Sequence, residues 1–214
     1  VFFESAGWER PQWFRANESL LDDLVGPGDT RSGWEAREWS PMVAAEHRAT
    51  RERVALFDLT PFMKLEVTGP GALAALQRLT ANNLDRPPGR VTYTAMLDPR
   101  GGIKCDLTVT RLSEDRFMVV TGGAMGLHDL GWMRRNVPDD GSVTITDISA
   151  AQCCIGVWGP KARELMTRVC EDDLTNDGFP YLTARQITVG GVPCLAVRIS
   201  YAGELGWEVY AATE

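Results

Sequence analysis

One carboxylate stands out on a stretch of alternating apolar and polar residues. Residues 91–112 read VTYTAMLDPRGGIKCDLTVTRL, and residues 99–102 interrupt two runs that alternate with the period of a β-strand. This pattern predicts a β-hairpin whose second strand carries Asp106 on the face opposite Cys105. The Asp106 carboxylate then either faces solvent or lines a cavity, where it could orient an amine or accept its proton.

A second acidic group lies in residues 200–210, which read SYAGELGWEVY. Glycines 203 and 206 allow a tight turn, and the following residues read as a strand that contains Glu208. Glu208 could hold a flat heterocycle by accepting two parallel N–H hydrogen bonds, or it could lie on a solvated strand face. If the turn forms as predicted, Glu204 and Glu208 cannot both face inward in the same way. Five side chains could line a site for an aromatic ligand: Phe62, Tyr93, Met96, Tyr201 and Trp207. Each of them, taken alone, is better explained as part of a buried core.

Composition excludes several classes of function. The chain has 214 residues and a net charge of -7 without a Lys/Arg run, which argues against a nucleic-acid surface. The longest apolar runs are too short to span a membrane, and the amino end lacks the apolar core of a signal peptide. The chain contains no dinucleotide-binding fingerprint, so we do not expect these residues to bind FAD. Two histidines, and five cysteines without C-x-x-C spacing, argue against a metal site. Reduced thiols predict the cytoplasm of a bacterium or the mitochondrial matrix of a eukaryote.

The elements that would position these residues follow from local signals. Residues 1–39, rich in Trp, Gly and Pro, predict an irregular arm whose aromatic side chains pack onto something else, such as a neighbouring domain. Ser40 and Pro41 predict the start of a helix that runs to about Val54. Further elements are expected as follows: helices over 71–80 and 125–136, and strands over 64–67, 117–120, 143–148, 182–189 and 193–199.

An internal repeat organises the chain. The residues VTGPGA at 67–72 recur as VWGPKA at 157–162, and GGIKC at 101–105 recurs as GGVPC at 190–194. The offsets are 90 and 89 residues, so we predict a duplicated α+β arrangement of strand–helix–strand units. Leu195 follows the second copy where Asp106 follows the first, so the acid belongs to one copy only.

Four motifs carry a family resemblance: EHRATRERVALFDLTPF, VTGPGALAALQRLTANNL, YTAMLDPRGGIKCDLTV and ISYAGELGWEVY. Over residues 40–214 they resemble the tetrahydrofolate-binding aminomethyltransferase family. This family includes the glycine cleavage T-protein and the carboxyl half of dimethylglycine and sarcosine dehydrogenases and oxidases. The motif GWERPQWF at 7–14 resembles the segment that follows the FAD domain in the dehydrogenase branch. The resemblance implies three subdomains around a folate channel, with this chain expected to supply the first two and to stop before most of the third.

The resemblance also implies an activity, in which an iminium-derived carbon is captured as 5,10-methylene-tetrahydrofolate. Tetrahydrofolate would be the cofactor, and FAD would bind only in an upstream flavin domain of the same polypeptide. Asp106 matches the catalytic acidic position, and the cofactor-binding matches are Phe62, Tyr93, Tyr201 and Glu208. T-proteins carry two consecutive acids where this chain has Cys105 and Asp106, so the acting position stays open, with strand alternation favouring Asp106.

Other functions remain open at this point. They are a T-protein-like aminomethyltransferase, a folate-binding or regulatory module without catalysis, and a module that docks a flavin domain. A further possibility is that the chain is a fragment without activity of its own, because it begins without Met and ends abruptly.

Overall fold

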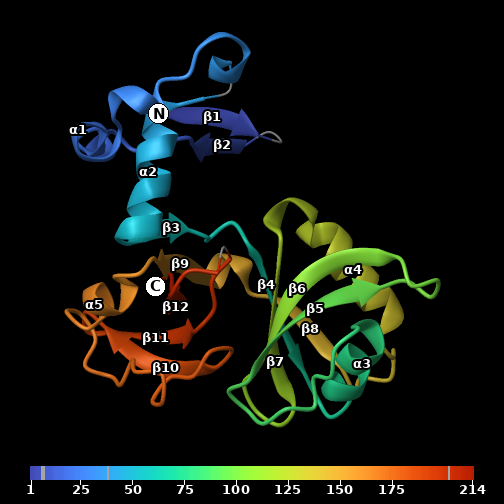
Figure 1. Cartoon of the computed structure of the whole chain (residues 1–214). Helices are drawn as coiled ribbons and strands as arrows, with labels where there is room; N and C mark the ends of the chain where they lie inside the picture. The colour runs from blue at the N-terminus through green and yellow to red at the C-terminus, as the bar shows by residue number, and fades with distance from the viewer. Residues whose placement is uncertain (6–7, 38, 202) are drawn as a thin grey trace.

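The computed structural model describes residues 1–5, 8–37, 39–201 and 203–214, and it is built around two five-stranded antiparallel sheets (Figure 1). The first sheet has the order β5-β6-β7-β4-β8. Its strands are β4 (Met63–Thr68), β5 (Val91–Leu97), β6 (Ile103–Arg111), β7 (Arg116–Thr121) and β8 (Thr144–Asp147). The second sheet has the order β10-β11-β12-β9-β3. Its strands are β3 (Ala55–Asp58), β9 (Gln152–Trp158), β10 (Ala184–Val189), β11 (Val192–Val197) and β12 (Gly206–Ala212).

The two sheets confirm the predicted duplication. In the first unit β4 is followed by helix α3 (Ala72–Leu79) and then by β5, β6 and β7. In the second unit β9 is followed by helix α5 (Ala162–Met166) and then by β10, β11 and β12, which occupy the same places in their sheet. Val67 pairs with Phe117 in the first unit and Val157 with Trp207 in the second, so the register also repeats at an offset of 90 residues.

The edge strands are exchanged between the two units. Strand β3 directly precedes β4 in the sequence but pairs with β9, and β8 directly precedes β9 but pairs with β4. Each unit therefore completes the sheet of the other. Because both crossings are hydrogen-bonded ladders, the relative position of the two sheets is set by backbone pairing as well as by side-chain packing.

The repeated Gly-Pro motif receives these exchanged strands. Gly69 and Gly159 have positive φ angles of 113° and 140°, a region that L side chains rarely adopt. A Cβ atom at Gly69 would lie 2.3 Å from the carbonyl oxygen of Ser142, and one at Gly159 would lie 2.4 Å from that of Arg53. Ser142 and Arg53 precede the two exchanged strands, so the glycines allow the chain to approach at both crossings.

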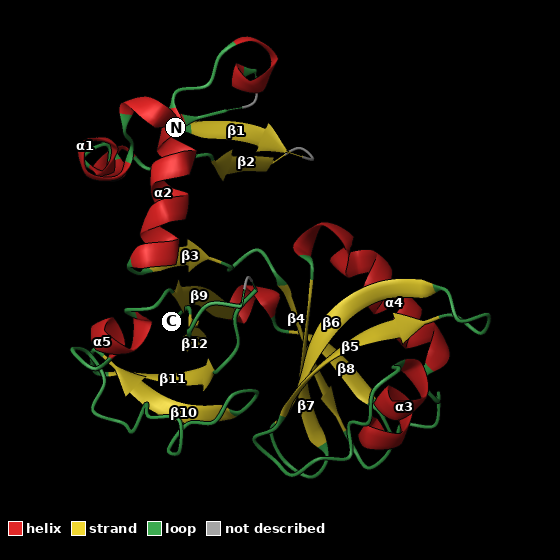
Figure 2. Ribbon diagram, in the orientation of Figure 1, coloured by secondary structure: helices red, strands yellow, loops and turns green. Residues whose placement is uncertain are grey.

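Three apolar cores result from this arrangement. Helices α3 and α4 (Gly126–Asn136) cover one face of the first sheet, and α5 covers the second (Figure 2). The opposite faces of the two sheets meet in a third core that includes Met118, Val120, Cys154 and Tyr210. No helix in the described ranges is long and apolar enough to cross a membrane.

The arm over residues 1–39 is more regular than its sequence predicts. It contains a hairpin of β1 (Phe2–Ser5) and β2 (Trp8–Pro11) and the helix α1 (Leu20–Leu24). The hairpin was not predicted because strands of only four residues are too short to show a periodic pattern. Its apolar contact is aliphatic, through Leu24 against helix α2 (Pro41–Glu52), whereas Phe2 and Trp34 are exposed. Short 3-10 helices complete the chain: Arg15–Asn17, Pro27–Asp29, Gly33–Ala36, Gly123–Met125 and Ser149–Ala151.

Most predicted boundaries hold to within a few residues. Helix α2 begins where Ser40 and Pro41 predict, and the Ser40 hydroxyl accepts a hydrogen bond from the Val43 amide at 3.4 Å. Two residues of the predicted motifs, Gly7 and Ala202, lie outside the described residues.

Candidate functional site

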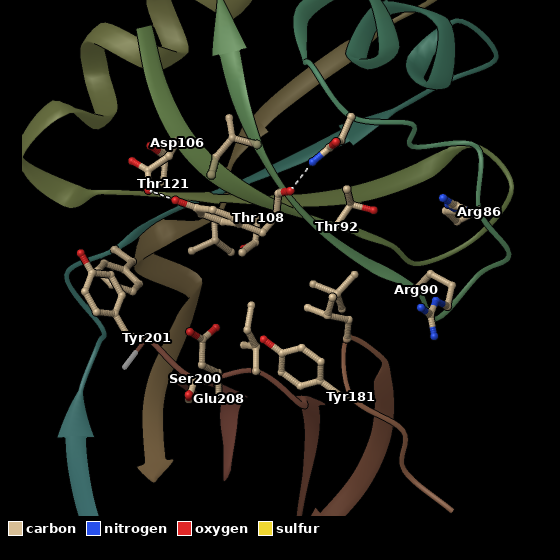
Figure 3. A pocket seen from close by; sticks show the side chains of 18 of the residues that line it. Arg86, Arg90, Thr92, Asp106, Thr108, Thr121, Tyr181, Ser200, Tyr201 and Glu208 are labelled. Atoms are coloured by element: carbon tan, nitrogen blue, oxygen red, sulfur yellow. Dashed lines mark hydrogen bonds between the residues drawn. The ribbon is translucent and has the colours of Figure 1, made fainter. Parts of the chain in front are cut away.

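A cavity of about 1000 Å³ lies between the two units. Strands of both sheets and five of the segments that connect the elements line it, and Figure 3 shows most of these side chains. All five residues predicted for the site are among them: Phe62, Tyr93, Asp106, Tyr201 and Glu208. The structure therefore brings together side chains that are up to 146 residues apart in the sequence.

The first unit contributes Asp106 and Tyr93 from the neighbouring strands β6 and β5. Their cavity-facing positions follow from the ladder, in which Ala95 is opposite Asp106 and Tyr93 is opposite Thr108. The Tyr93 hydroxyl donates a hydrogen bond to Asp106 Oδ2 at 2.7 Å. This bond and the Asp106 charge raise the pKa of Tyr93, so the phenol keeps its proton and orients the carboxylate. Asp106 Oδ1 has no hydrogen-bond partner within the described part of the chain.

Cys105 lies on the other face of the same strand, as alternation predicts. It packs against the core of the first unit, and burial is the main cause that raises the pKa of its thiol to about 12. A thiol that stays protonated is a poor nucleophile and a poor base. Of the two consecutive positions, Asp106 is therefore the one that can accept a proton from a ligand in the cavity.

The second unit contributes Glu208 from the central strand β12. Glu208 is only 7% exposed, and the Tyr210 hydroxyl donates to its Oε2 at 2.6 Å. Burial raises the pKa of Glu208, and the hydrogen bond from Tyr210 opposes that shift. Figure 3 shows the Glu208 carboxylate pointing into the cavity, across from Asp106. Glu204 instead forms an ion pair with Arg51 of α2, so the two glutamates have different roles, as their spacing predicts.

Two aromatic or apolar residues hold the remaining predicted positions. Tyr201 lies between β11 and β12 and is 83% exposed, with its ring at the cavity. Phe62 lies in the turn before β4, where the buried Lys64 Nζ donates to the carbonyls of Thr60 at 2.8 Å and Phe62 at 3.1 Å. Lys64 therefore fixes the turn that carries Phe62, and burial lowers the pKa of Lys64.

Two residues that the sequence analysis considered as lining of an aromatic site, Met96 and Trp207, do not line the cavity. Met96 is 1% exposed in the core of the first unit, and Trp207 is fully buried in the core of the second. Strand alternation places each of them on the helix-covered face of its sheet, which sequence reasoning could not tell from the cavity face.

The sequence reasoning also missed part of the lining. Arg86 and Arg90 line the cavity, as do Tyr181 and Leu182 on the segment that leads into β10. Leu182 has a positive φ of 57°, which is rare for a residue other than glycine, and its backbone bonds to Val91 and Arg198 hold it there. The motif RPPGR over residues 86–90 was the available signal for the arginines, but a motif does not show that a cation lacks a partner. Across the described residues, no group of three potential ligands could hold a metal ion.

Comparison with known proteins agrees with this architecture. The family model described as the GCVT N-terminal domain matches residues 1–214. Human mitochondrial dimethylglycine dehydrogenase is 35% identical over 98% of this chain and 23% of its own length. The 4-methylaminobutanoate oxidase (formaldehyde-forming) of Paenarthrobacter nicotinovorans is 35% identical over 100% of this chain and 25% of its own length. The chain thus spans about a quarter of the length of these two curated relatives.

The fold has a solved counterpart as well. The crystal structure of glycine cleavage system aminomethyltransferase T from Bartonella henselae matches with a TM-score of 0.73 and 21% identity, over 99% of this chain and 49% of that one. The α+β fold implied by the four sequence motifs is therefore confirmed, as is the relationship to dimethylglycine dehydrogenase. The chain belongs to the GCVT N-terminal domain family.

Proposed function

We propose that this chain is a tetrahydrofolate-binding, one-carbon transfer module of a dimethylglycine or sarcosine dehydrogenase-like protein. Its product would be 5,10-methylene-tetrahydrofolate, formed with an iminium-derived carbon, and amine oxidation would take place at a flavin held by other residues. The observation that carries this proposal is the single cavity in which Asp106 of one unit faces Glu208 of the other. The names of the relatives, which include a dehydrogenase and an oxidase of methylated amines, support the choice of substrate class.

The residues of the cavity fit a reduced folate. Glu208 is a nearly buried acceptor with Oε2 engaged by Tyr210, which leaves Oε1 for the N–H groups of a flat heterocycle. Phe62, Tyr93 and Tyr201 provide rings along the same cavity, whose volume is at the upper end of the range of about 300–1000 Å³ for small-molecule sites. When bound, tetrahydrofolate would supply the nitrogen atoms that accept the one-carbon unit.

The residues of this chain then have separate tasks. Glu208 would bind and orient the heterocycle, since its position on a central strand leaves little freedom to its carboxylate. Asp106 would accept or hold a proton at the reacting end through Oδ1, while Tyr93 fixes its other oxygen. Holding the proton acceptor in place before the ligand arrives reduces the entropic cost of reaching the reactive geometry.

Asp106→Asn tests the catalytic part of the proposal. Calorimetry should show that the variant still binds tetrahydrofolate, because Glu208 and the aromatic walls are unchanged. Methylene-tetrahydrofolate formation, measured in a protein that also carries the flavin-dependent oxidation, should fall by about 10²–10⁴-fold. Asp139→Asn is the matched control, since Asp139 is exposed in a turn outside the cavity lining. Undiminished product formation by the Asp106 variant would reduce the cavity to a passive binding site, and the absence of folate binding to the unmodified chain would refute the proposed function.

A further inference from the structure

A second cavity lies between the two sheets, apart from the candidate site. Its volume is about 240 Å³, and residues of both units line it, such as Met118 of β7 and Leu195 of β11. None of the described residues lines both cavities. The function proposed above leaves this second cavity without a role.

The internal repeat relates the second cavity to the candidate site. Equivalent positions are 90 residues apart in β4 and β9 and in β7 and β12, and 89 residues apart in β6 and β11. Gln186 is opposite Leu195 as Ala95 is opposite Asp106, so the ladders also align β5 with β10. For Phe62, Tyr93, Asp106, Tyr201 and Glu208, in this order, the equivalent residues are Gln152, Ala184, Leu195, Leu112 and Met118. All five equivalents line the second cavity, which is therefore the counterpart of the candidate site.

The side chains at the five equivalent positions have a different chemistry. Leucine and methionine replace the two carboxylates, and alanine and leucine replace the two tyrosines. The second cavity therefore presents an apolar surface where the candidate site presents proton acceptors. Such a surface favours the carbon atoms of a ligand's ring, so the two cavities select different molecules.

Gln152, which takes the place of the phenylalanine, brings a hydrogen-bond acceptor to the second cavity. Its Oε1 atom is buried and has no hydrogen-bond partner among the described residues. A buried acceptor without a partner is rare in folded proteins, because it has lost its hydration without compensation. An N–H group of a bound molecule would supply the missing donor.

The charged side chains at the second cavity are already paired. Arg116 Nε donates to Glu66 at 2.7 Å. Arg111 Nη1 donates to Asp85 at 2.9 Å, and Arg185 donates to a backbone carbonyl. An ionised ligand would lose its hydration without meeting an unpaired opposite charge, so the cavity favours an uncharged ligand. Its volume is below the range of about 300–1000 Å³ for drug-sized ligands, which limits the ligand to one or two small rings.

We propose that the second cavity is a binding site for a small uncharged heterocycle. A ring N–H group donates to Oε1 of Gln152, and the ring packs against Leu112, Met118 and Leu195. This binding does not depend on folate chemistry. The inference therefore goes beyond the proposed function and can fail separately from it.

Indole and 1-methylindole form a matched pair of probes for this site, because they share a ring system and only indole has an N–H donor. Titrations of the full chain, followed by the NMR shifts of its amides, would measure both Kd values. Indole should bind with a Kd on the order of 1 mM, as expected for so small a ligand. 1-Methylindole should bind about 2–10-fold more weakly, since one hydrogen bond is lost. The shifted resonances should come from residues around the second cavity, Gln152 and Leu195 among them.

A variant at Gln152 identifies the acceptor. Gln152→Leu should lower the ratio of the two Kd values to about one, because leucine is of similar size and has no acceptor. Gln12→Leu is the matched control, since Gln12 is exposed in the arm and lines neither cavity, and it should keep the full ratio. Because the ratio compares two probes on one protein, a partly unfolded variant does not distort it.

Three results would overturn the proposal. They are no binding of indole at about 10 mM, tenfold above the expected Kd, equal Kd values for the two probes, and a ratio that survives in Gln152→Leu. The last result would mean that the N–H group meets another acceptor, such as a carboxylate of the candidate site. None of these results bears on tetrahydrofolate binding, which is measured with a different ligand at the larger cavity.

Discussion

Replacing Tyr210 by Phe would isolate the hydrogen bond that supports Glu208. Tyr210 and Glu208 are 2% and 7% exposed, and the bond between them is 2.6 Å long. The phenyl ring keeps the packing of the tyrosine in the core between the sheets, so the variant loses the hydroxyl alone. A hydrogen bond to a charged partner contributes about 1.5–3 kcal/mol to stability, whereas a neutral one contributes about 1 kcal/mol.

The pH dependence follows from the ionisation of Glu208. Burial raises its folded-state pKa above the ordinary value of 4.5, so the unfolded chain ionises first as the pH rises. The free energy of unfolding therefore falls as the pH rises from 4.5 to the folded-state pKa. Without the Tyr210 hydroxyl the folded-state pKa of Glu208 rises further, because the hydrogen bond that opposes the effect of burial is lost.

Urea unfolding at two pH values would measure this effect. Tyr210→Phe should cost about 1 kcal/mol at a pH well below 4.5, where Glu208 is protonated in both states, and about 1.5–3 kcal/mol at a pH above the folded-state pKa, where the hydrogen bond acts on a carboxylate. In the background of Glu208→Gln, which cannot ionise, the cost of Tyr210→Phe should be equal at the two pH values. A cost in the unmodified background that does not change with pH would refute the view that Glu208 is a buried carboxylate supported by Tyr210.

Two further predictions concern the architecture around the site. Gly69→Ala and Gly159→Ala should each destabilise the fold by more than about 2 kcal/mol, through positive φ and collision with a carbonyl oxygen, whereas Gly190→Ala, with a positive φ but open space, should cost about 1 kcal/mol. Equal melting temperatures for the three variants would contradict the tight crossings. Lys64→Met should cost about 1–3 kcal/mol, since two half-buried carbonyls lose their donor. Burial lowers the pKa of Lys64, so the free energy of unfolding should rise as the pH increases toward 10.5. If the urea midpoint of Lys64→Met rises in the same way, the rise cannot be assigned to the titration of Lys64.

Much of the site was predictable because its signals are local. Short-range patterns predict the hairpin, the cap at Ser40 and the location of Asp106 and Cys105 on the two faces of one strand, and the structure has all three. The duplication was visible because each copy repeats the same turn residues, and Gly69 and Gly159 are required at equivalent crossings. The family motifs predicted which residues would line the cavity, and all five line it.

Other features depend on contacts between distant segments. Alternation along a strand defines two faces but not which one meets a cavity, so Met96 and Trp207 could not be excluded. Nothing local distinguishes a strand that pairs with its own unit from one that pairs with the other, and the exchange of β3 and β8 was not predicted.

The hairpin residues by themselves determined the face of Asp106, because side-chain direction in a strand is a property of neighbouring residues. Only the tertiary structure decided that this face meets Glu208 across one cavity and that Arg86 and Arg90 have no ion-pair partner among the described residues. The physical reason is that burial and charge pairing depend on which distant segments share a space, and the exchanged strands set that arrangement here.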